Sequence, residues 1–324
     1  MDELLELWAK QPGIRDDGMD VFVGGFPWEK EAAPAPAASK TAGPSGVWIK
    51  QLLPGRDIAR EKDARTTREA LTFGAAKQMR NLIYLVGCLA TRECYVVDAC
   101  WDVEGIVRAA KEHGMKLVGA IASHYHFDHT GGFLMEPYLG MIMGPFAKQV
   151  SSKDEWPRLG GIYELCVEHA CKLYVHAGDL PALAQQVGLQ PERFVPLAHN
   201  AALPLGTSGQ LTILHTQGHS PGSICVVVTS KEGVVTHAGG ESAPKAVISG
   251  DTLFPGSCGR LDGDDCSVEA MHDSLERLRA LPDDTQVLPG HAYSGMASTI
   301  GREKTMGLLR PFSREQWMRM MSHR

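Results

Sequence analysis

Residues 116–129 read KLVGAIASHYHFDH, an apolar run followed by three histidines and one aspartate within six residues. The run is typical of a buried strand, and apolar residues at helical spacing in the preceding segment, 103–110, predict a β-α-β unit. The unit delivers His124 to the C-terminal end of a strand, in a loop where side chains can converge. Because imidazole and carboxylate groups are common ligands of divalent metals, His124, His126, Asp128 and His129 are candidate ligands.

Three later apolar runs each end in a further candidate ligand. These are His219 in TQGHSPGS, Asp251 in SGDTLF and His291 in PGHAYSG. Seven candidates are what two adjacent metal ions require. A bridging carboxylate holds two cations about 3.5–4 Å apart, and a shared water then forms hydroxide near neutral pH. The pattern therefore indicates hydrolysis of a carbonyl compound.

From about Val47 to Lys304 the sequence resembles the metallo-β-lactamase fold superfamily, within it the glyoxalase II and persulfide dioxygenase branches. The resemblance implies an α/β fold, a four-layer αββα sandwich with the metals at one edge. It further implies a role for each candidate: His124, His126 and His219 bind the first metal, Asp128, His129 and His291 bind the second, and Asp251 bridges them. Asp98, after the strand-like YVV, matches a position that supports the metal-binding loop without binding metal, although an Asp after a strand is often only a turn residue.

The segment FPGSCGRLD (254–262) is a partial match to the CGRTDF-like pattern of persulfide dioxygenases and their bacterial glyoxalase II-like relatives. Leu261 and Gly263 stand where that pattern has Thr and Phe. Arg260 is suited to the carboxylate of a thiol tripeptide, because its planar fork forms bidentate pairs. The alternative is that Arg260 braces its own loop through Asp262 or backbone carbonyls. The short segment 292–324 leaves no room for the larger C-terminal helical domain of glyoxalase II enzymes.

We expect a metal-dependent hydrolase of a thioester, such as an acyl-glutathione, acting through a metal-bridging hydroxide formed from water. Asp128 would orient this nucleophile and accept its proton. Its cofactors would be two divalent metal ions, zinc in the first place, with iron or manganese as other choices. The alternative is an Fe(II)-dependent persulfide dioxygenase acting on glutathione persulfide, with His124, His219 and Asp251 as ligands. A scaffold with a purely structural metal is the weakest hypothesis, because structural sites have four closed ligands per ion.

The composition is that of a folded chain without a nucleic-acid partner. Of 324 residues, 44% are hydrophobic and 22% charged, which excludes global disorder. The net charge of −6, without a dense Lys/Arg run, argues against nucleic-acid binding, so we expect a small thioester or thiol, such as a glutathione derivative, as the partner.

No apolar stretch approaches the ~20 residues of a membrane span, and the start, MDELLELWAK, is acidic. We therefore expect no membrane association and a cytoplasmic location. The eight cysteines form no CxxC pair and are expected to be reduced.

The sequence predicts an N-terminal extension and flexible linker (1–46), rich in Ala, Pro and Ser over 29–46, and a catalytic domain (47–324). Insertions are expected near 59–81, as a surface excursion, and near 132–165, as a lid, a substrate wall or a segment packed on the sandwich. His176, although it ends a strand, is excluded from the metal set. The same applies to other histidines without a ligand-like neighbourhood: His199, His215, His237 and His272.

The extension is predicted to be dispensable, because its composition buries too little apolar surface to offset the entropy of ordering it. A chain that starts near Gly46 should keep its fold and its activity, measured by circular dichroism and turnover. Loss of either would contradict the assignment.

Overall fold

The computed structural model describes residues 45–134, 138–144, 147, 157–237 and 242–321. Its first strand begins at Val47. The predicted extension lies almost entirely outside the described residues, so its boundary stays a prediction.

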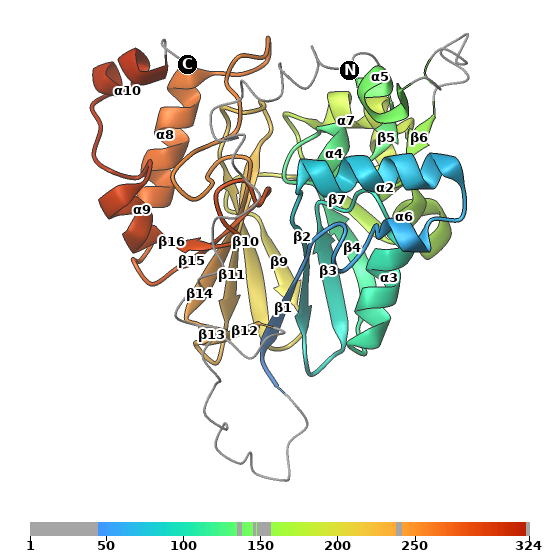
Figure 1. Cartoon of the computed structure of the whole chain (residues 1–324). Helices are drawn as coiled ribbons and strands as arrows, with labels where there is room; N and C mark the ends of the chain where they lie inside the picture. The colour runs from blue at the N-terminus through green and yellow to red at the C-terminus, as the bar shows by residue number, and fades with distance from the viewer. Residues whose placement is uncertain (1–44, 135–137, 145–146, 148–156, 238–241, 322–324) are drawn as a thin grey trace.

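Two sheets form the centre of the molecule (Figure 1). In the described part of the chain, the larger sheet has eight strands in the order β13-β12-β1-β2-β3-β4-β7-β8. Its strands are β1 (Val47–Leu52), β2 (Ile83–Cys88), β3 (Glu93–Val97), β4 (Lys116–Ile121), β7 (Lys172–His176), β8 (Phe194–Leu197), β12 (Val235–His237) and β13 (Ser242–Ala243).

The smaller sheet has six strands over the same described residues, in the order β16-β15-β14-β11-β10-β9. They are β9 (Ala202–Leu205), β10 (Gly209–His215), β11 (Ile224–Ser230), β14 (Lys245–Gly250), β15 (Gln286–Pro289) and β16 (Ser298–Thr299). A separate short pair consists of β5 (Gly132–Phe133) and β6 (Arg158–Leu159).

Helices cover the outer face of each sheet, as Figure 1 shows. The larger sheet carries α2 (Thr67–Met79), α3 (Val103–Glu112), α4 (Phe127–Thr130), α5 (Tyr138–Met143), α6 (Ile162–His169) and α7 (Leu180–Val187), with short 3₁₀ turns η2 (Glu61–Asp63) and η5 (Pro191–Arg193). The smaller sheet carries α8 (Val268–Arg279), α9 (Ile300–Met306) and α10 (Arg314–Met321).

Three apolar cores separate these four layers. In β1, Val47 and Ile49 face the core between the sheets, whereas Trp48 faces the core under α2 and α3, because successive side chains of a strand point to opposite faces. The third core lies between the smaller sheet and the helices α8, α9 and α10. The expected four-layer αββα sandwich is therefore confirmed.

The sequence over 267–278, with Ser267 ahead of Met271, Leu275 and Leu278 at helical spacing, is typical of a capped amphipathic helix, and the structure has one there. Ser267 accepts a hydrogen bond from the Ala270 backbone N–H and so caps α8. Met271, Leu275 and Leu278 are buried on one face of this helix.

The segment 59–81, expected as a surface excursion, is mainly a helix that forms part of a layer. Phe73, Ala76 and Met79 of α2 are buried in the core over the larger sheet. The exposed, charged side chains gave the sequence its excursion-like pattern, while these three residues attach the helix to the sheet.

Two further expectations concern the pairing of the cysteines and the presence of membrane-spanning helices. The eight cysteines, all within the described residues, form no disulfide, and six of them are buried. Among the described residues, no helix combines the length and the apolar character that a membrane crossing requires.

The α10 helix should contribute substantially to stability through Trp317. This side chain is 1% exposed, and its indole N–H donates to the Val268 carbonyl at 2.7 Å. Trp317→Ala should lower the free energy of unfolding in urea by about 3–5 kcal/mol. Met306→Ala, at a side chain that is 67% exposed, is the control and should change it by less than about 0.5 kcal/mol. Equal effects would contradict this account of the third core.

Candidate metal centre

The seven candidate ligands lie in α4 and in loops at strand ends of both sheets, and their ligand atoms come together in three overlapping groups. His124 follows β4, and His219 lies in the loop between β10 and β11. Asp251 and His291 follow β14 and β15, which are parallel neighbours and so end at the same edge. A single β-bridge pairs Asn81 with His291 and joins the two sheets there.

Within the described residues, three groups have ligand atoms close enough to share one ion, with all atoms of a group within 4.8 Å of one another. The first trio is His124, His126 and His219; the second trio is Asp128, His129 and His291; and the third group is His124, His129 and Asp251.

Asp251 lies between the two trios. Its Oδ1 is 3.4 Å from His129 Nε2, a ligand atom of the second trio. Its Oδ2 is 3.6 Å from both His219 Nε2 of the first trio and His291 Nε2 of the second. One carboxylate therefore faces both groups of imidazoles.

The outer ring nitrogens of three histidines contact groups that can only accept hydrogen bonds. His219 Nδ1 is 2.8 Å from the Arg260 carbonyl oxygen, and His291 Nδ1 is 2.8 Å from the Met79 carbonyl oxygen. His129 Nδ1 is 3.0 Å from the Asp98 carboxylate. Because each Nδ1 must carry the proton, the Nε2 of each neutral ring presents a lone pair to the centre.

His124 has the same orientation through a hydrogen-bond relay. The Ser123 hydroxyl donates to Asp98 Oδ2 at 2.7 Å, so it accepts from His124 Nδ1 at 3.0 Å. Asp98 also accepts from the Ser123 backbone N–H at 2.7 Å. Asp98 thus contacts the loop that carries the HxHxDH pattern and does not face the centre itself.

The inward-facing nitrogens lie very close together. His129 Nε2 and His291 Nε2 are 3.1 Å apart, and His126 Nδ1 is 3.1 Å from His124 Nε2 and 3.0 Å from His219 Nε2. Two lone pairs at this distance repel unless a cation lies between them. In addition, Asp251 Oδ1 is buried without a hydrogen-bond partner. Crowded imidazole lone pairs and an unpaired carboxylate oxygen fit a divalent metal site.

Burial and neighbouring charges adjust the protonation of the centre. Burial and the adjacent imidazoles lower the pKa of His124, and they lower that of His126 to about 4, so both are neutral ligands at pH 7. Burial opposes protonation of His129 as well, but the carboxylates of Asp128, Asp251 and Asp98 raise its pKa to about 10. Without a metal ion, the centre therefore attracts a proton, which is the response of a site built for a cation.

Asp128 is ionised, although it is buried. Burial alone would raise its pKa, but the imidazoles of His129 and His291 and the Asn81 amide hold that pKa well below its usual range.

Asn81 was not among the candidates from the sequence. Its Oδ1 accepts from the Trp101 indole N–H at 3.0 Å, which fixes the amide with Nδ2 toward Asp128 Oδ2, also at 3.0 Å. It lies two residues before β2, pairs with His291 through the bridge between the sheets, and places its Nδ2 3.4 Å from His291 Nε2. No spacing in the sequence marks such a contact.

Glycines allow the backbone to approach this centre closely. A Cβ at Gly290 would lie 2.4 Å from Asp251 Oδ1, and one at Gly259 would lie 2.8 Å from His219 Nδ1. Neither distance is compatible with a side chain, so both positions require glycine.

The Arg260 side chain pairs with Asp262 in its own loop, as expected if it braces that loop instead of binding a substrate carboxylate. Its Nε donates to Asp262 Oδ1 at 2.9 Å, and both side chains are at least half exposed. Its backbone carbonyl, rather than its guanidinium, contacts His219. The proposed clamp on a substrate carboxylate stays a prediction.

Other regions considered from the sequence lie apart from the metal groups. His176 stacks on His215 with ring centroids 3.8 Å apart, and the metal groups found in the described residues include neither.

In the predicted insertion 132–165, Leu139, Ile142 and Met143 of α5 are buried in the core near α2. Residues 135–137, 145–146 and 148–156 lie outside the described residues, so the lid stays a prediction.

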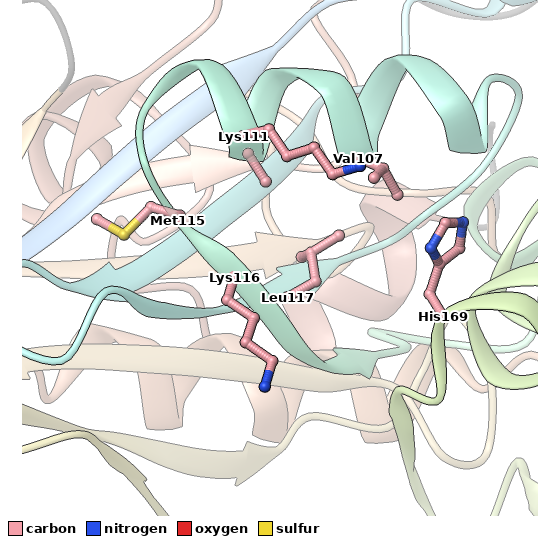
Figure 2. A pocket seen from close by; sticks show the side chains of 7 residues that line it. Val107, Lys111, Met115, Lys116, Leu117 and His169 are labelled. Carbon is pink, nitrogen blue, oxygen red and sulfur yellow. The ribbon is translucent and has the colours of Figure 1, made fainter.

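A surface hollow of about 290 Å³ lies between α3, the start of β4 and the end of α6 (Figure 2). Lys111, Lys116 and His169 stand around it, over an apolar base that includes Met115 and Leu117. None of the candidate ligands lines this hollow, so it is not part of the metal centre.

The sandwich and the cluster define a metalloprotein with a divalent metal site. Residues 78–135 and 240–291 match the model of the Metallo-beta-lactamase superfamily. A metallo-beta-lactamase from Staphylococcus aureus superimposes with a TM-score of 0.59 at 22% identity, over 85% of this chain and 67% of that one. ETHE1 from Myxococcus xanthus superimposes with a TM-score of 0.53 at 22% identity, over 75% of this chain and 86% of that one. The chain has the metallo-β-lactamase fold, and the resemblance seen in its sequence is confirmed.

Sequence relatives include proteins named hydroxyacylglutathione hydrolase. A hydroxyacylglutathione hydrolase of Rhodospirillum rubrum is 31% identical over 215 residues, which cover 66% of this chain and 63% of that protein. An uncharacterised protein of Aquifex aeolicus is 28% identical over 227 residues, which cover 69% of this chain and 87% of that protein. The chain therefore spans less than two thirds of the hydrolase that it resembles.

The Asn81 amide should stabilise the fold even without metal. In the presence of a chelator, Asn81→Ala should lower the free energy of unfolding by about 1–3 kcal/mol, because the buried Trp101 N–H loses its acceptor. Trp101→Phe removes the donor, and the double variant should lose less than the sum of the two single losses. Strictly additive losses would contradict a direct coupling.

Proposed function

We propose that this chain is a dinuclear metal-dependent hydrolase of a thioester such as an acyl-glutathione. The proposal rests above all on Asp251, whose two oxygens face imidazoles of both trios. A carboxylate that faces both trios is suited to bridge two ions. In this proposal the first trio holds one ion, the second trio holds the other, and Asp251 bridges them, with zinc as the expected metal.

Two divalent cations bound there would polarise the substrate carbonyl and supply hydroxide at neutral pH. The chain's own groups orient the reactants. Asp128 is kept ionised by the neighbouring imidazoles and the Asn81 amide. A carboxylate of low pKa accepts a hydrogen bond from a water more readily than it retains a proton, so we assign Asp128 to orienting the attacking water and taking its proton only transiently.

In the reaction, a bond forms between the water oxygen and the acyl carbon, and the carbon–sulfur bond breaks. The products are a carboxylic acid and a free thiol. The relatives named hydroxyacylglutathione hydrolase support a glutathione thioester as the substrate. Arg260 is our candidate for binding a carboxylate of the thiol portion.

The Fe(II)-dependent persulfide dioxygenase is the alternative activity, because His219 Nε2 and Asp251 Oδ2 lie 3.6 Å apart beside His124 in a two-histidine, one-carboxylate arrangement. Metal analysis of the full-length protein, purified without added metal, separates the two activities when it is combined with a panel of thioesters, lactones and persulfides. Two zinc ions per chain and thioester hydrolysis are expected. One iron per chain with oxygen-dependent loss of persulfide would replace the hydrolase proposal.

The bridging role of Asp251 can be separated from that of a terminal ligand. His291→Ala should leave about one metal ion per chain, because the first trio is intact. Asp251→Ala should leave well below one, because both ions lose a ligand and the anion that offsets their mutual repulsion. Metal content after gel filtration measures both values. Two tightly bound ions in Asp251→Ala would refute the bridge.

Arg260→Ala should raise KM for an anionic thioester roughly tenfold and change kcat little, since a charge-assisted hydrogen bond remote from the reacting carbonyl contributes about 1.5 kcal/mol of uniform binding. Arg279→Ala is the control, because Arg279 pairs with Glu276 on α8 in a similar surface contact. If Arg260→Ala changes neither constant, the arginine only braces its loop through Asp262.

A further inference from the structure

Asp179 is the N-cap residue that directly precedes α7 (Leu180–Val187), but its side chain does not cap that helix. An aspartate there ordinarily accepts a hydrogen bond from the first turn. Here the carboxylate is 1% exposed and accepts three bonds from elsewhere. They come from the Tyr125 backbone N–H at 3.0 Å, the Ser220 hydroxyl at 2.7 Å and the Gly222 backbone N–H at 2.5 Å.

These three donors belong to the two loops that carry the first trio. Tyr125 stands between His124 and His126, and Ser220 directly follows His219. The two loops come from different sheets, since one follows β4 and the other joins β10 to β11. A single buried carboxylate therefore connects the loops whose imidazoles must converge.

The surrounding backbone is shaped for this contact. A Cβ at Gly222 would lie 2.3 Å from the Asp179 backbone nitrogen, and one at Gly178 would lie 2.9 Å from the Pro221 carbonyl oxygen. Only glycine at both positions lets the segment before α7 approach the loop after β10 so closely.

Asp98 makes the corresponding contacts on the other side of the centre. It accepts from Ser123 and from His129 Nδ1, a ring of the second trio, but it makes no hydrogen bond to the loop of His219. Both buried carboxylates thus contact the HxHxDH loop, but Asp179 also connects that loop to the loop of His219.

We propose that Asp179 is a positioning residue that fixes the geometry of the first trio, so that its loss weakens one of the two metal ions selectively. This inference rests on the proposed dinuclear site. The physical reason is that imidazoles bind a cation tightly only when their loops are held in advance, and partners behind the ligands typically change metal affinity by about 10–100-fold.

The test measures the zinc affinity of single sites by competition with a chromophoric chelator. In a His291→Ala background only the first trio is complete, and in a His219→Ala background only the second. Adding Asp179→Asn, which keeps the shape but places an amide against backbone N–H groups, should weaken zinc about 10–100-fold in the first background and less than threefold in the second.

Asp102→Asn is the matched control, because Asp102 also accepts two backbone N–H bonds, from Ala59 and Gly105, but contacts neither ligand loop. It should leave zinc affinity unchanged in both backgrounds. If Asp179→Asn does not fold, Ser220→Ala removes one of the three bonds and should act in the same direction with a smaller effect.

Equal weakening in both backgrounds, or none in either, would overturn the role of Asp179 while leaving the dinuclear hydrolase intact. Wild-type protein that binds no zinc would instead overturn the proposed function itself, and the inference with it.

Discussion

The structure depends on a fixed orientation of imidazole rings. Four of the five candidate histidine ligands have their outer nitrogen bound to a carbonyl, a carboxylate or a hydroxyl that is itself committed to a carboxylate. Each of these rings must therefore direct a lone pair at the centre. Lone pairs about 3 Å apart favour a cation between them, which fits a divalent metal site at this centre.

The ligands come from both sheets, which makes the centre part of the seam of the sandwich. The HxHxDH loop belongs to the larger sheet, and His219, Asp251 and His291 belong to the smaller one. Between them, the Leu82 backbone N–H donates to the Gly290 carbonyl, and the Tyr84 hydroxyl donates to the Pro289 carbonyl at 2.6 Å. Under our proposal, ions bound at this seam would hold the two sheets together, and metal binding would be thermodynamically linked to fold stability.

The sequence predicts the strand-then-ligand order well, because each ligand directly follows an apolar run and strand ends gather at one edge. It also predicts the capped helix α8, whose pattern is local. It does not reveal Asn81 or Asp179, since Asn81 contacts His291, 210 positions away, and Asp179 contacts Ser220, 41 positions away, each across the boundary between the two sheets. It misjudges 59–81 because exposed charges outnumber the three apolar residues that attach α2 to the sheet. Arg260 was ambiguous from the sequence, and its ion pair with Asp262 is a contact between neighbours that no periodic pattern records.

The central claim is that Asp251 and the two trios hold a pair of ions rather than one. X-ray absorption at the metal edge of the fully loaded protein tests this most directly, because scattering between neighbouring metals is visible only when two ions share a site. The account predicts nitrogen and oxygen ligands with a metal–metal distance of about 3.5–4 Å. A spectrum with the same ligands but no metal–metal scattering would contradict it.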